Sequence, residues 1–218
     1  MSDSERTRRF SQEALVRAQG LLEANRSHCN WISSYGFVST LIESISAVNV
    51  LEVGVAYGYH ADYLLDRHPS IHYVGVDPYV HGYDPQDSFS FDVRRLFAPE
   101  SAFMDLLFLS VHRNLEKYLG RASLLRRTSQ SAAELIGNNS LDLVFIDGDH
   151  RPESVLADVS AWYPKVKEGG ILCGDDFNWP GTPEVLVRFF EYLGVPLIGY
   201  RSADGIVLKW SVVKPTRT

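Results

Sequence analysis

Seven short apolar runs alternate with helical stretches along the chain, and this alternation limits the fold more than any other feature. The runs cover residues 48–53, 72–76, 123–125, 141–146, 170–173, 196–198 and 206–210. Nearly continuous apolar runs are typical of strands buried on both faces, and strands separated by helices form a parallel sheet covered by helices on each side. The sequence therefore predicts an α/β fold: a Rossmann-like, doubly wound, mostly parallel sheet of seven strands with helices on both faces.

The two ends of the chain add further elements to this plan. Residues 199–205 are too few for a helix between the last two runs, so we expect a C-terminal antiparallel hairpin. Residues 10–28 have the pattern of an amphipathic helix, and a second helix is expected from Phe37 to Ile45. We predict a helical extension over residues 1–33 and one α/β domain over residues 34–218. Within that domain, residues 79–100 form either a lid over a ligand site or a surface loop.

Composition excludes several classes of protein. The 218 residues carry a net charge of −6, which disfavours a nucleic-acid partner. The N-terminal segment MSDSERTRRF lacks the apolar stretch of a secretory signal, and no run approaches the length of a membrane span. Cys29 and Cys173 show no zinc-ligand spacing, and we expect two buried free thiols. A cytoplasmic protein, either monomeric or homo-oligomeric, is the expectation.

A glycine-bearing turn follows the first run, where Gly54 and Gly58 are spaced G-x-x-x-G. The tight G-x-G-x-x-G turn that holds a pyrophosphate is absent, so this site suits a cofactor without phosphates. Glu52 lies just before the turn, and a buried carboxylate there requires a cationic or hydrogen-bond-donating partner. Asp77 ends the second run, where an acid can accept both hydroxyls of a ribose.

The motifs Leu51-Glu52-Val53-Gly54…Gly58-Tyr59 and Val74-Gly75-Val76-Asp77 resemble motifs I and II of class I S-adenosylmethionine-dependent methyltransferases. More narrowly, they resemble the catechol O-methyltransferase-like group and its relatives that methylate macrolide sugars. The resemblance covers most of residues 34–212 and implies methionine contacts at Glu52 and Gly54, a ribose contact at Asp77 and residues flanking the adenine at Ser129 and Gln130. The chain departs from the catechol enzymes at His60, where they have serine. The expected cofactor site comprises Glu52, Gly54, Gly58, Tyr59, Asp77, Ser129, Gln130 and Asp147.

Acidic residues also end the fourth and fifth runs. Asp147 follows the fourth, and Asp175 and Asp176 follow the fifth. Carboxyl ends of neighbouring parallel strands open onto one crevice, so we expect these three acids to converge. Converging carboxylates repel one another unless a cation lies among them, and oxygen ligands favour Mg²⁺ over Ca²⁺ or Mn²⁺. The catechol-like family holds its metal at matching positions. Asp149 is expected to cap a turn.

His150 lies three residues after Asp147, the place of the general base in the resembled family. That base is lysine in the catechol enzymes and histidine in the sugar-methylating relatives. The resemblance therefore implies a Mg²⁺-dependent O-methyltransferase in which His150 takes a proton from a hydroxyl of a small molecule, such as a sugar or phenol of a natural product. Three alternatives remain open at this stage: a metal-independent methyltransferase, a non-catalytic cofactor-binding module, and a nicotinamide dehydrogenase, which the glycine spacing disfavours.

Overall fold

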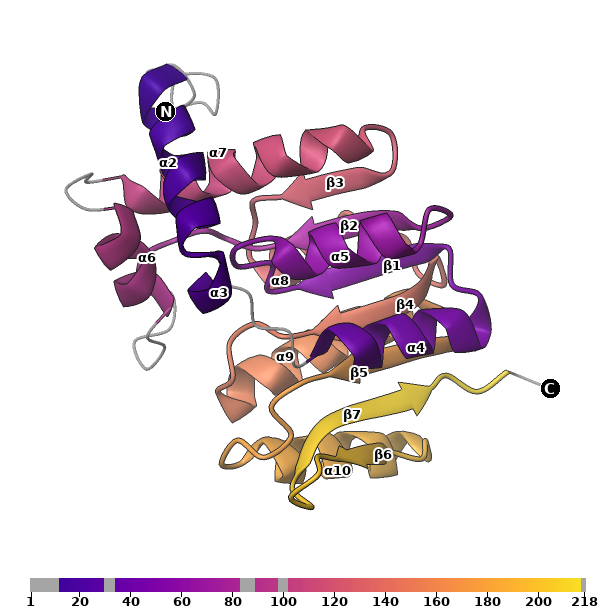
Figure 1. Ribbon diagram of the computed structural model, residues 1–218. Helices are drawn as coiled ribbons and strands as arrows, with labels where there is room; N and C mark the ends of the chain where they lie inside the picture. Colours follow the sequence, from indigo (N-terminus) through magenta and orange to yellow (C-terminus); the bar gives the residue numbers. More distant parts are fainter. Residues whose placement is uncertain (1–11, 30–33, 83–88, 98–101, 217–218) are drawn as a thin grey trace.

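The computed structural model of the protein describes residues 12–29, 34–82, 89–97 and 102–216. Within these ranges the chain forms one seven-stranded sheet of order β3-β2-β1-β4-β5-β7-β6 (Figure 1). The strands are β1 (Asn49–Val53), β2 (His72–Val76), β3 (Ala122–Leu125), β4 (Leu141–Ile146), β5 (Val166–Gly174), β6 (Ile198–Arg201) and β7 (Val207–Val213). The first five are parallel, and β7 runs antiparallel to both of its neighbours. The predicted fold class and C-terminal hairpin are confirmed.

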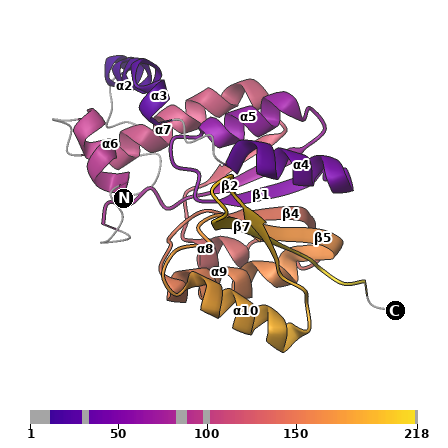
Figure 2. The same ribbon diagram turned by 60° about the horizontal axis from the view of Figure 1, so that its bottom comes forward.

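Helices cover both faces of this sheet (Figure 2). On one face lie α4 (Tyr35–Ile45), α5 (Tyr59–Arg67) and α7 (Phe103–Leu115), and on the other lie α8 (Ser129–Ala133), α9 (Pro152–Trp162) and α10 (Thr182–Leu193). The 3-10 turns η2 (Glu116–Tyr118) and η3 (Tyr163–Lys165) follow α7 and α9. Proline occupies the first turn of both α9 and α10, where its fixed backbone angle suits the start of a helix. None of the described helices is both long and apolar enough to cross a membrane.

The strand sequences explain why both faces are covered. Successive side chains of a strand point to opposite faces, and β4 is apolar on each. Leu143 and Phe145 pack into the core beneath α4, α5 and α7, whereas Val144 and Ile146 pack against α8, α9 and α10. Cys29 and Cys173 are buried free thiols, as predicted.

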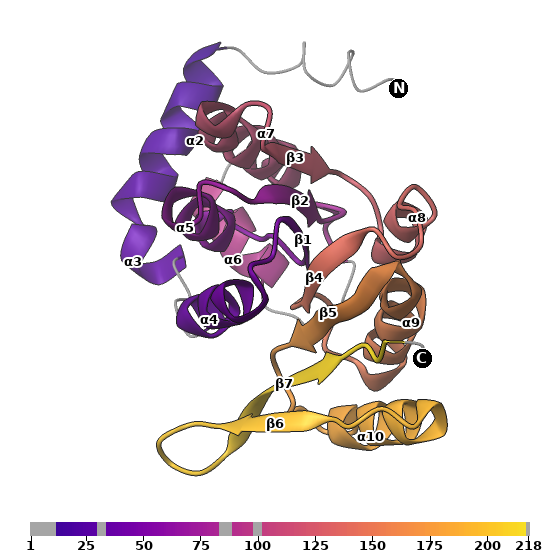
Figure 3. The same cartoon turned by 90° about the vertical axis from the view of Figure 1, so that its right-hand side faces the viewer.

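The N-terminal segment contributes α2 (Gln12–Ala24) and α3 (Arg26–Cys29), with a turn at Asn25 where one continuous helix was predicted. The Asn25 side-chain amide donates to the carbonyl of Leu21 at 2.8 Å, a local bond that competes with helix continuation. α2 packs along α7 and α6 (Phe89–Phe97), on the face of the sheet that carries α5 (Figure 3). Of residues 79–100, expected to form a lid or a surface loop, residues 83–88 and 98–100 lie outside the described ranges, and α6 forms the part between them.

The parallel strands end level with one another. Beyond the last paired residues, the amide of Gly54 donates to Val76, that of Asp147 to Val53 and that of Asp175 to Ile146. The sheet ladder therefore continues one residue past the strands and brings Asp77, Asp147 and Asp175 to one edge. The acids that the sequence places after separate runs become neighbours through this ladder.

A substitution at Gly174 would test the packing behind the carboxyl edge of the sheet. A Cβ atom at this position would lie 2.7 Å from three atoms of the Trp210 ring, and that ring is fully buried. We expect Gly174→Ala to destabilise the protein by about 1–3 kcal/mol because the rigid indole must move. Thermal unfolding measures the loss, and Gly137→Ala, where a Cβ meets nothing within 4 Å, is the matched control. Equal melting temperatures for the two variants would contradict the prediction.

Candidate active site

A cavity of about 340 Å³ lies at the carboxyl edge of the sheet. It is lined by many of the residues that the sequence singled out, from five different segments. These are Gly54 after β1, Asp77 after β2, Ser129 and Gln130 on α8, Asp147 and His150 after β4, and Asp175 and Asp176 after β5. Glu52, Gly58 and Tyr59 line a smaller adjoining pocket that also contacts Gly54 and Asp147. The structure thus brings the whole predicted site together.

The glycine turn is required by close backbone packing. Gly54 has φ +89°, and a Cβ atom there would lie 2.0 Å from the carbonyl oxygen of Asp147. Gly58 has φ +76°, and its Cβ would lie 2.6 Å from a methyl group of Val111 on α7. Both positions therefore admit glycine alone, and the turn presents backbone rather than side chains to the cavity.

Asp77 organises this turn from the end of β2. One carboxylate oxygen accepts the amides of Val55 and Ala56 at 3.1 and 3.0 Å, and the other accepts the amide of Tyr79 at 2.8 Å. Burial raises the pKa of Asp77 to about 6, although these three hydrogen bonds oppose the shift. Asp77 therefore has a structural task in addition to the ribose contact expected from the sequence.

On α8, Ser129 and Gln130 are held by partners on α9. The Trp162 indole donates to Ser129 Oγ at 2.7 Å, and the Gln130 amide donates to Asp158 at 2.9 Å. Asp158 is 3% exposed and lines the cavity, and burial raises its pKa to about 7. Sequence reasoning missed Asp158, because an acid within an amphipathic helix is ordinarily solvated.

Glu52 is buried, and both of its carboxylate oxygens have hydrogen-bonding partners within the chain. The Tyr73 hydroxyl donates to one of its oxygens, and Nδ1 of His60 lies 2.8 Å from the other. The neighbouring Tyr59 hydroxyl donates to the carbonyl of Leu22 at 2.9 Å, which ties the domain to α2. A direct contact between Glu52 and a cofactor, as the resemblance implies, would have to share these oxygens.

Asp147, His150 and Asp176 form a cluster of metal-ligating side chains among the described residues. One ligand atom from each lies within 4.8 Å of the other two. Nδ1 of His150 lies 2.9 Å from Asp176. The pKa of Asp147 is raised well above its usual value, first by burial and then by the charges of Asp175 and Asp176. A cation in this cluster would relieve the repulsion.

Asp175 has side-chain partners that differ from those of Asp147 and Asp176. The Ser34 hydroxyl donates to one of its oxygens, while Nζ of Lys209 lies 3.5 Å from the other. Lys209 is on β7 and only 8% exposed, and a buried ammonium requires such an anionic partner. Of the three predicted metal ligands, Asp147 and Asp176 lie in the cluster, whereas Asp175 is paired with a lysine.

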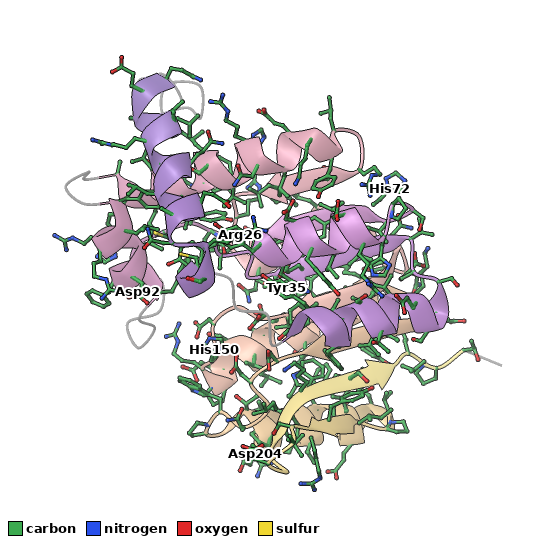
Figure 4. The ribbon with its side chains drawn as sticks, in the orientation of Figure 1. Arg26, Tyr35, His72, Asp92, His150 and Asp204 are labelled. Carbon is green, nitrogen blue, oxygen red and sulfur yellow. The ribbon has the colours of Figure 1, made fainter. Side chains whose placement is uncertain are left out.

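His150 and Asp149 have separate environments within one loop. Asp149 accepts the amide of Arg151 at 3.0 Å and the Ser154 hydroxyl at 2.7 Å, so it organises the turn before α9 as expected. Arg151 is the N-cap of α9, and its side chain forms no capping hydrogen bond with the described residues. Its ring lies 5.2 Å from the ring of Trp179, and Figure 4 shows it ahead of α9 at the carboxyl edge of the sheet.

The outer wall of the cavity is apolar. Val80, Phe89 and Met104 contribute to it from the segment after β2, from α6 and from α7. Of the other aromatic residues of α6, Phe97 is buried in the core and Phe91 is exposed. Phe89 is therefore the aromatic side chain of α6 that reaches the cavity.

The family to which the chain belongs follows from comparison with known proteins. A family model described as a methyltransferase domain matches residues 51–177, which is more than half of the chain. The chain therefore belongs to this methyltransferase family, and the expected membership of the class I methyltransferases is confirmed. A curated relative, uncharacterized protein R132 of Acanthamoeba polyphaga mimivirus, is 37% identical over 49 residues, and this match spans 22% of each protein.

Solved structures share the fold. A candidate caffeoyl-CoA O-methyltransferase from Staphylococcus aureus aligns with a TM-score of 0.63 at 14% identity, covering 96% of each chain. TomG of Streptomyces achromogenes, an O-methyltransferase involved in tomaymycin synthesis and solved with S-adenosylmethionine, aligns with a TM-score of 0.57 at 15% identity, covering 95% of this chain and 92% of TomG. Podospora anserina methyltransferase PaMTH1, bound to S-adenosylhomocysteine, aligns with a TM-score of 0.59 at 15% identity, covering 94% of this chain and 89% of PaMTH1. At these identities the likeness is one of fold.

The buried carboxyl of Asp158 predicts a dependence of stability on pH. Its folded pKa of about 7 exceeds the unfolded value of about 3.9, so the native state retains a proton that the unfolded state loses between these values. Its contribution to stability therefore falls as the pH rises from about 4 to about 7. Asp158→Asn cannot titrate and should be more stable than the wild type at pH 8, on the order of 1–3 kcal/mol, with little difference at pH 4.

Thermal unfolding at pH 4, 6 and 8 measures this effect. Asp66→Asn on α5 is the matched control, because it removes the same group from an exposed position. If Asp158→Asn and the wild type lose stability in parallel across this range, the assignment of the proton to Asp158 is wrong.

Proposed function

We propose that the chain is a Mg²⁺-dependent O-methyltransferase that transfers the methyl group of S-adenosylmethionine to a hydroxyl of a small molecule. The observation that carries this proposal is the single cavity that Gly54 and Asp77 share with Asp147, His150 and Asp176. The first two residues belong to the cofactor motifs, and the last three form the acid and imidazole cluster. A methyl donor and a hydroxyl acceptor bound there would meet at Asp147, which lines both the cavity and its adjoining pocket.

The proposed cofactor site is supported by its hydrogen-bonding groups, and it lacks the glycine-rich turn that binds phosphate. A carboxylate offers about four acceptor positions, so the three backbone donors on Asp77 leave one for a ribose hydroxyl. Ser129 and Gln130 would flank the adenine from α8. TomG and PaMTH1, which share the fold, were solved with S-adenosylmethionine and S-adenosylhomocysteine respectively.

The donor set of the cluster fits a divalent cation. Asp147 and Asp176 would hold it, with His150 within reach, whereas Asp175 would join only by sharing its oxygens with Lys209. Carboxylate oxygens are the ligands that Mg²⁺ prefers. Such an ion would polarise a substrate hydroxyl and lower its pKa.

His150 is proposed as the base that removes the proton from that hydroxyl. Its contact with Asp176 orients the ring, and a neutral imidazole accepts one proton at neutral pH. The acceptor oxygen then attacks the methyl carbon and forms the new C–O bond. The C–S bond breaks with its electron pair returning to sulfur, which leaves S-adenosylhomocysteine. Alignment of the two substrates in the cavity would contribute much of the rate.

The acceptor is proposed as a sugar or phenol of a natural product, seated against the apolar wall of Val80, Phe89 and Met104. The net charge of −6 disfavours a nucleic acid as acceptor. Two buried free thiols are consistent with a reducing compartment, and we propose the cytoplasm.

Calorimetry with S-adenosylhomocysteine and with NAD tests the cofactor, and transfer from labelled S-adenosylmethionine to a panel of phenols and sugar-bearing natural products tests the reaction. Binding of the first ligand together with methylation of a hydroxyl would support the proposal. Binding without transfer to any acceptor would favour a non-catalytic module, and binding of NAD alone would favour a dehydrogenase.

A metal requirement should depend on Asp176. We expect excess chelator to abolish turnover, Mg²⁺ to restore it, and Mg²⁺ to raise the melting temperature because it binds only the folded state. Asp176→Asn should lose this thermal shift and still bind S-adenosylhomocysteine. Asp142→Asn, at the other end of β4 and paired with Lys167, is the matched control and should respond to Mg²⁺ as the wild type does. Full turnover in chelator would instead favour a metal-independent methyltransferase.

His150→Ala should lower turnover by about 10²–10⁴-fold, the usual effect of removing a positioned base. Cofactor affinity should change little, because His150 lies at the acid cluster rather than at the glycine turn. Steady-state rates and calorimetry separate the two effects. His72→Ala, an exposed histidine at the start of β2, is the control and should leave both unchanged. Near-normal turnover of His150→Ala would remove this residue from the mechanism.

A further inference from the structure

A buried cation, Lys209 of β7, lies beside the acid cluster and has no part in the proposed reaction. Its side chain is 10% exposed, and Nζ lies 3.5 Å from the carboxylate of Asp175. The residues on either side of it in the strand, Leu208 and Trp210, are apolar. An apolar side chain of similar length would avoid the cost of removing an ammonium group from water. This cost indicates that the lysine has a task at Asp175.

The register of the sheet sets this pairing. β7 runs antiparallel to β5 and pairs Trp210 with Gly174, the last residue of β5 (Figure 1). One residue further along this register, Asp175 comes opposite Lys209, and side chains that lie opposite each other share one face of the sheet. The lysine therefore reaches the acid from the neighbouring strand without any change in the backbone.

Two further donors hold the same carboxylate. Ser34 is the N-cap of α4, a position where the serine oxygen ordinarily accepts an amide of the helix. Its side chain makes no such bond with the described residues, and its hydroxyl donates to Asp175 instead. The backbone amide of Asp176 donates at 2.9 Å to the oxygen that faces Lys209. Groups from three segments thus fix the position of Asp175.

The two adjacent acids have different partners because the chain turns between them. Asp176 has φ +53°, a left-handed conformation that aspartate adopts more readily than most residues. Its carboxylate lies 2.9 Å from Nδ1 of His150 and belongs to the cluster with Asp147. The carboxylate of Asp175 is directed toward α4 and β7 instead, as its contacts with Ser34 and Lys209 establish.

The charges balance in two separate groups. In the proposed site, the two carboxylates of Asp147 and Asp176 would neutralise a divalent cation. Lys209 neutralises Asp175. Mg²⁺ usually keeps several waters and is bound through one or two carboxylates together with substrate oxygens. A third carboxylate on the ion would occupy a position that an acceptor oxygen could use.

We propose that Lys209 is a positioning residue that keeps Asp175 out of the coordination of the metal. The ion is then held by Asp147 and Asp176, and more of its positions stay open to water and to the acceptor. This inference rests on the proposed function. It departs from the resemblance, which implies that all three acids are ligands.

Manganese binding tests the inference, because Mn²⁺ suits the same oxygen ligands as Mg²⁺. The electron paramagnetic resonance signal of free Mn²⁺ measures the affinity directly and does not depend on turnover. Lys209→Met keeps most of the length of the side chain and removes its charge. We expect this variant to bind Mn²⁺ about ten- to hundredfold more tightly, because Asp175 becomes free to join the ion and a repelling charge is lost.

The double variant Lys209→Met/Asp175→Asn removes the pair without changing the net charge. We expect its Mn²⁺ affinity to stay within about threefold of the wild type, because neither group contacts the ion. Asp176→Asn removes a ligand and should bind at least about tenfold more weakly. Lys167→Met is the matched control, because it breaks a lysine–aspartate pair at the other end of the sheet, and it should bind as the wild type does.

The outcomes separate this inference from the proposed function. Equal affinities of Lys209→Met and the wild type overturn the inference alone. A double variant as weak as Asp176→Asn also overturns it, since Asp175 would then be a ligand in the wild type. Binding by Lys209→Met but not by the wild type would support the inference and overturn the metal requirement of the proposed function. Binding by neither protein would overturn both.

A measurement on the wild type covers the case in which Lys209→Met does not fold. Mg²⁺ is diamagnetic, so the ¹³C resonances of the side-chain carboxylates can be followed as it is added. We expect the resonances of Asp147 and Asp176 to move and that of Asp175 to stay nearly in place. A shift of the Asp175 resonance equal to that of Asp176 would contradict the assignment.

Discussion

The contact between the backbone at Gly54 and the carbonyl of Asp147 is the constraint on which the rest of the site depends. Even one carbon atom at Gly54 would lie 2.0 Å from that carbonyl oxygen. The first glycine turn and the end of β4 can therefore approach only as bare main chain. This approach brings the acid cluster beside the cofactor turn, and it leaves Asp77 to hold the turn from the opposite side through the amides of Val55 and Ala56. In the proposed reaction, this approach would bring the methyl donor and the acceptor close enough to react.

Much of the fold could be predicted because its signals are local. Apolar runs marked the strands, and the short segment between the last two runs marked the antiparallel hairpin. Boundaries were less accurate: β5 begins at Val166, four residues before the expected run, because Val166 pairs with Leu141 of β4 ahead of a shift in register. The joining of the acids at one edge was also predictable, since parallel strands end together.

The partners within the site could not be predicted, because they depend on long-range packing. Lys209 reaches Asp175 only after β7 has entered the sheet between β5 and β6. His60 meets Glu52 because the first turn of α5 lies over β1, and Asp158 meets Gln130 because α8 packs on α9. Each pair joins residues whose individual sequence contexts are unremarkable. The sequence could therefore name Glu52 and Asp175 but not the groups that pair with them.

The pairing of Lys209 with Asp175 bears on how the protein is assembled in the cell. An acid-lined site whose charges were all uncompensated would fold poorly until a metal arrived, and the nascent chain would depend on the supply of that ion. Here one of the three acids has its own cation, supplied by Lys209 of β7, and burial favours protonation of Asp147. The sheet can thus close before any ion is present. Loading of the proposed metal would then follow folding as a separate and reversible event.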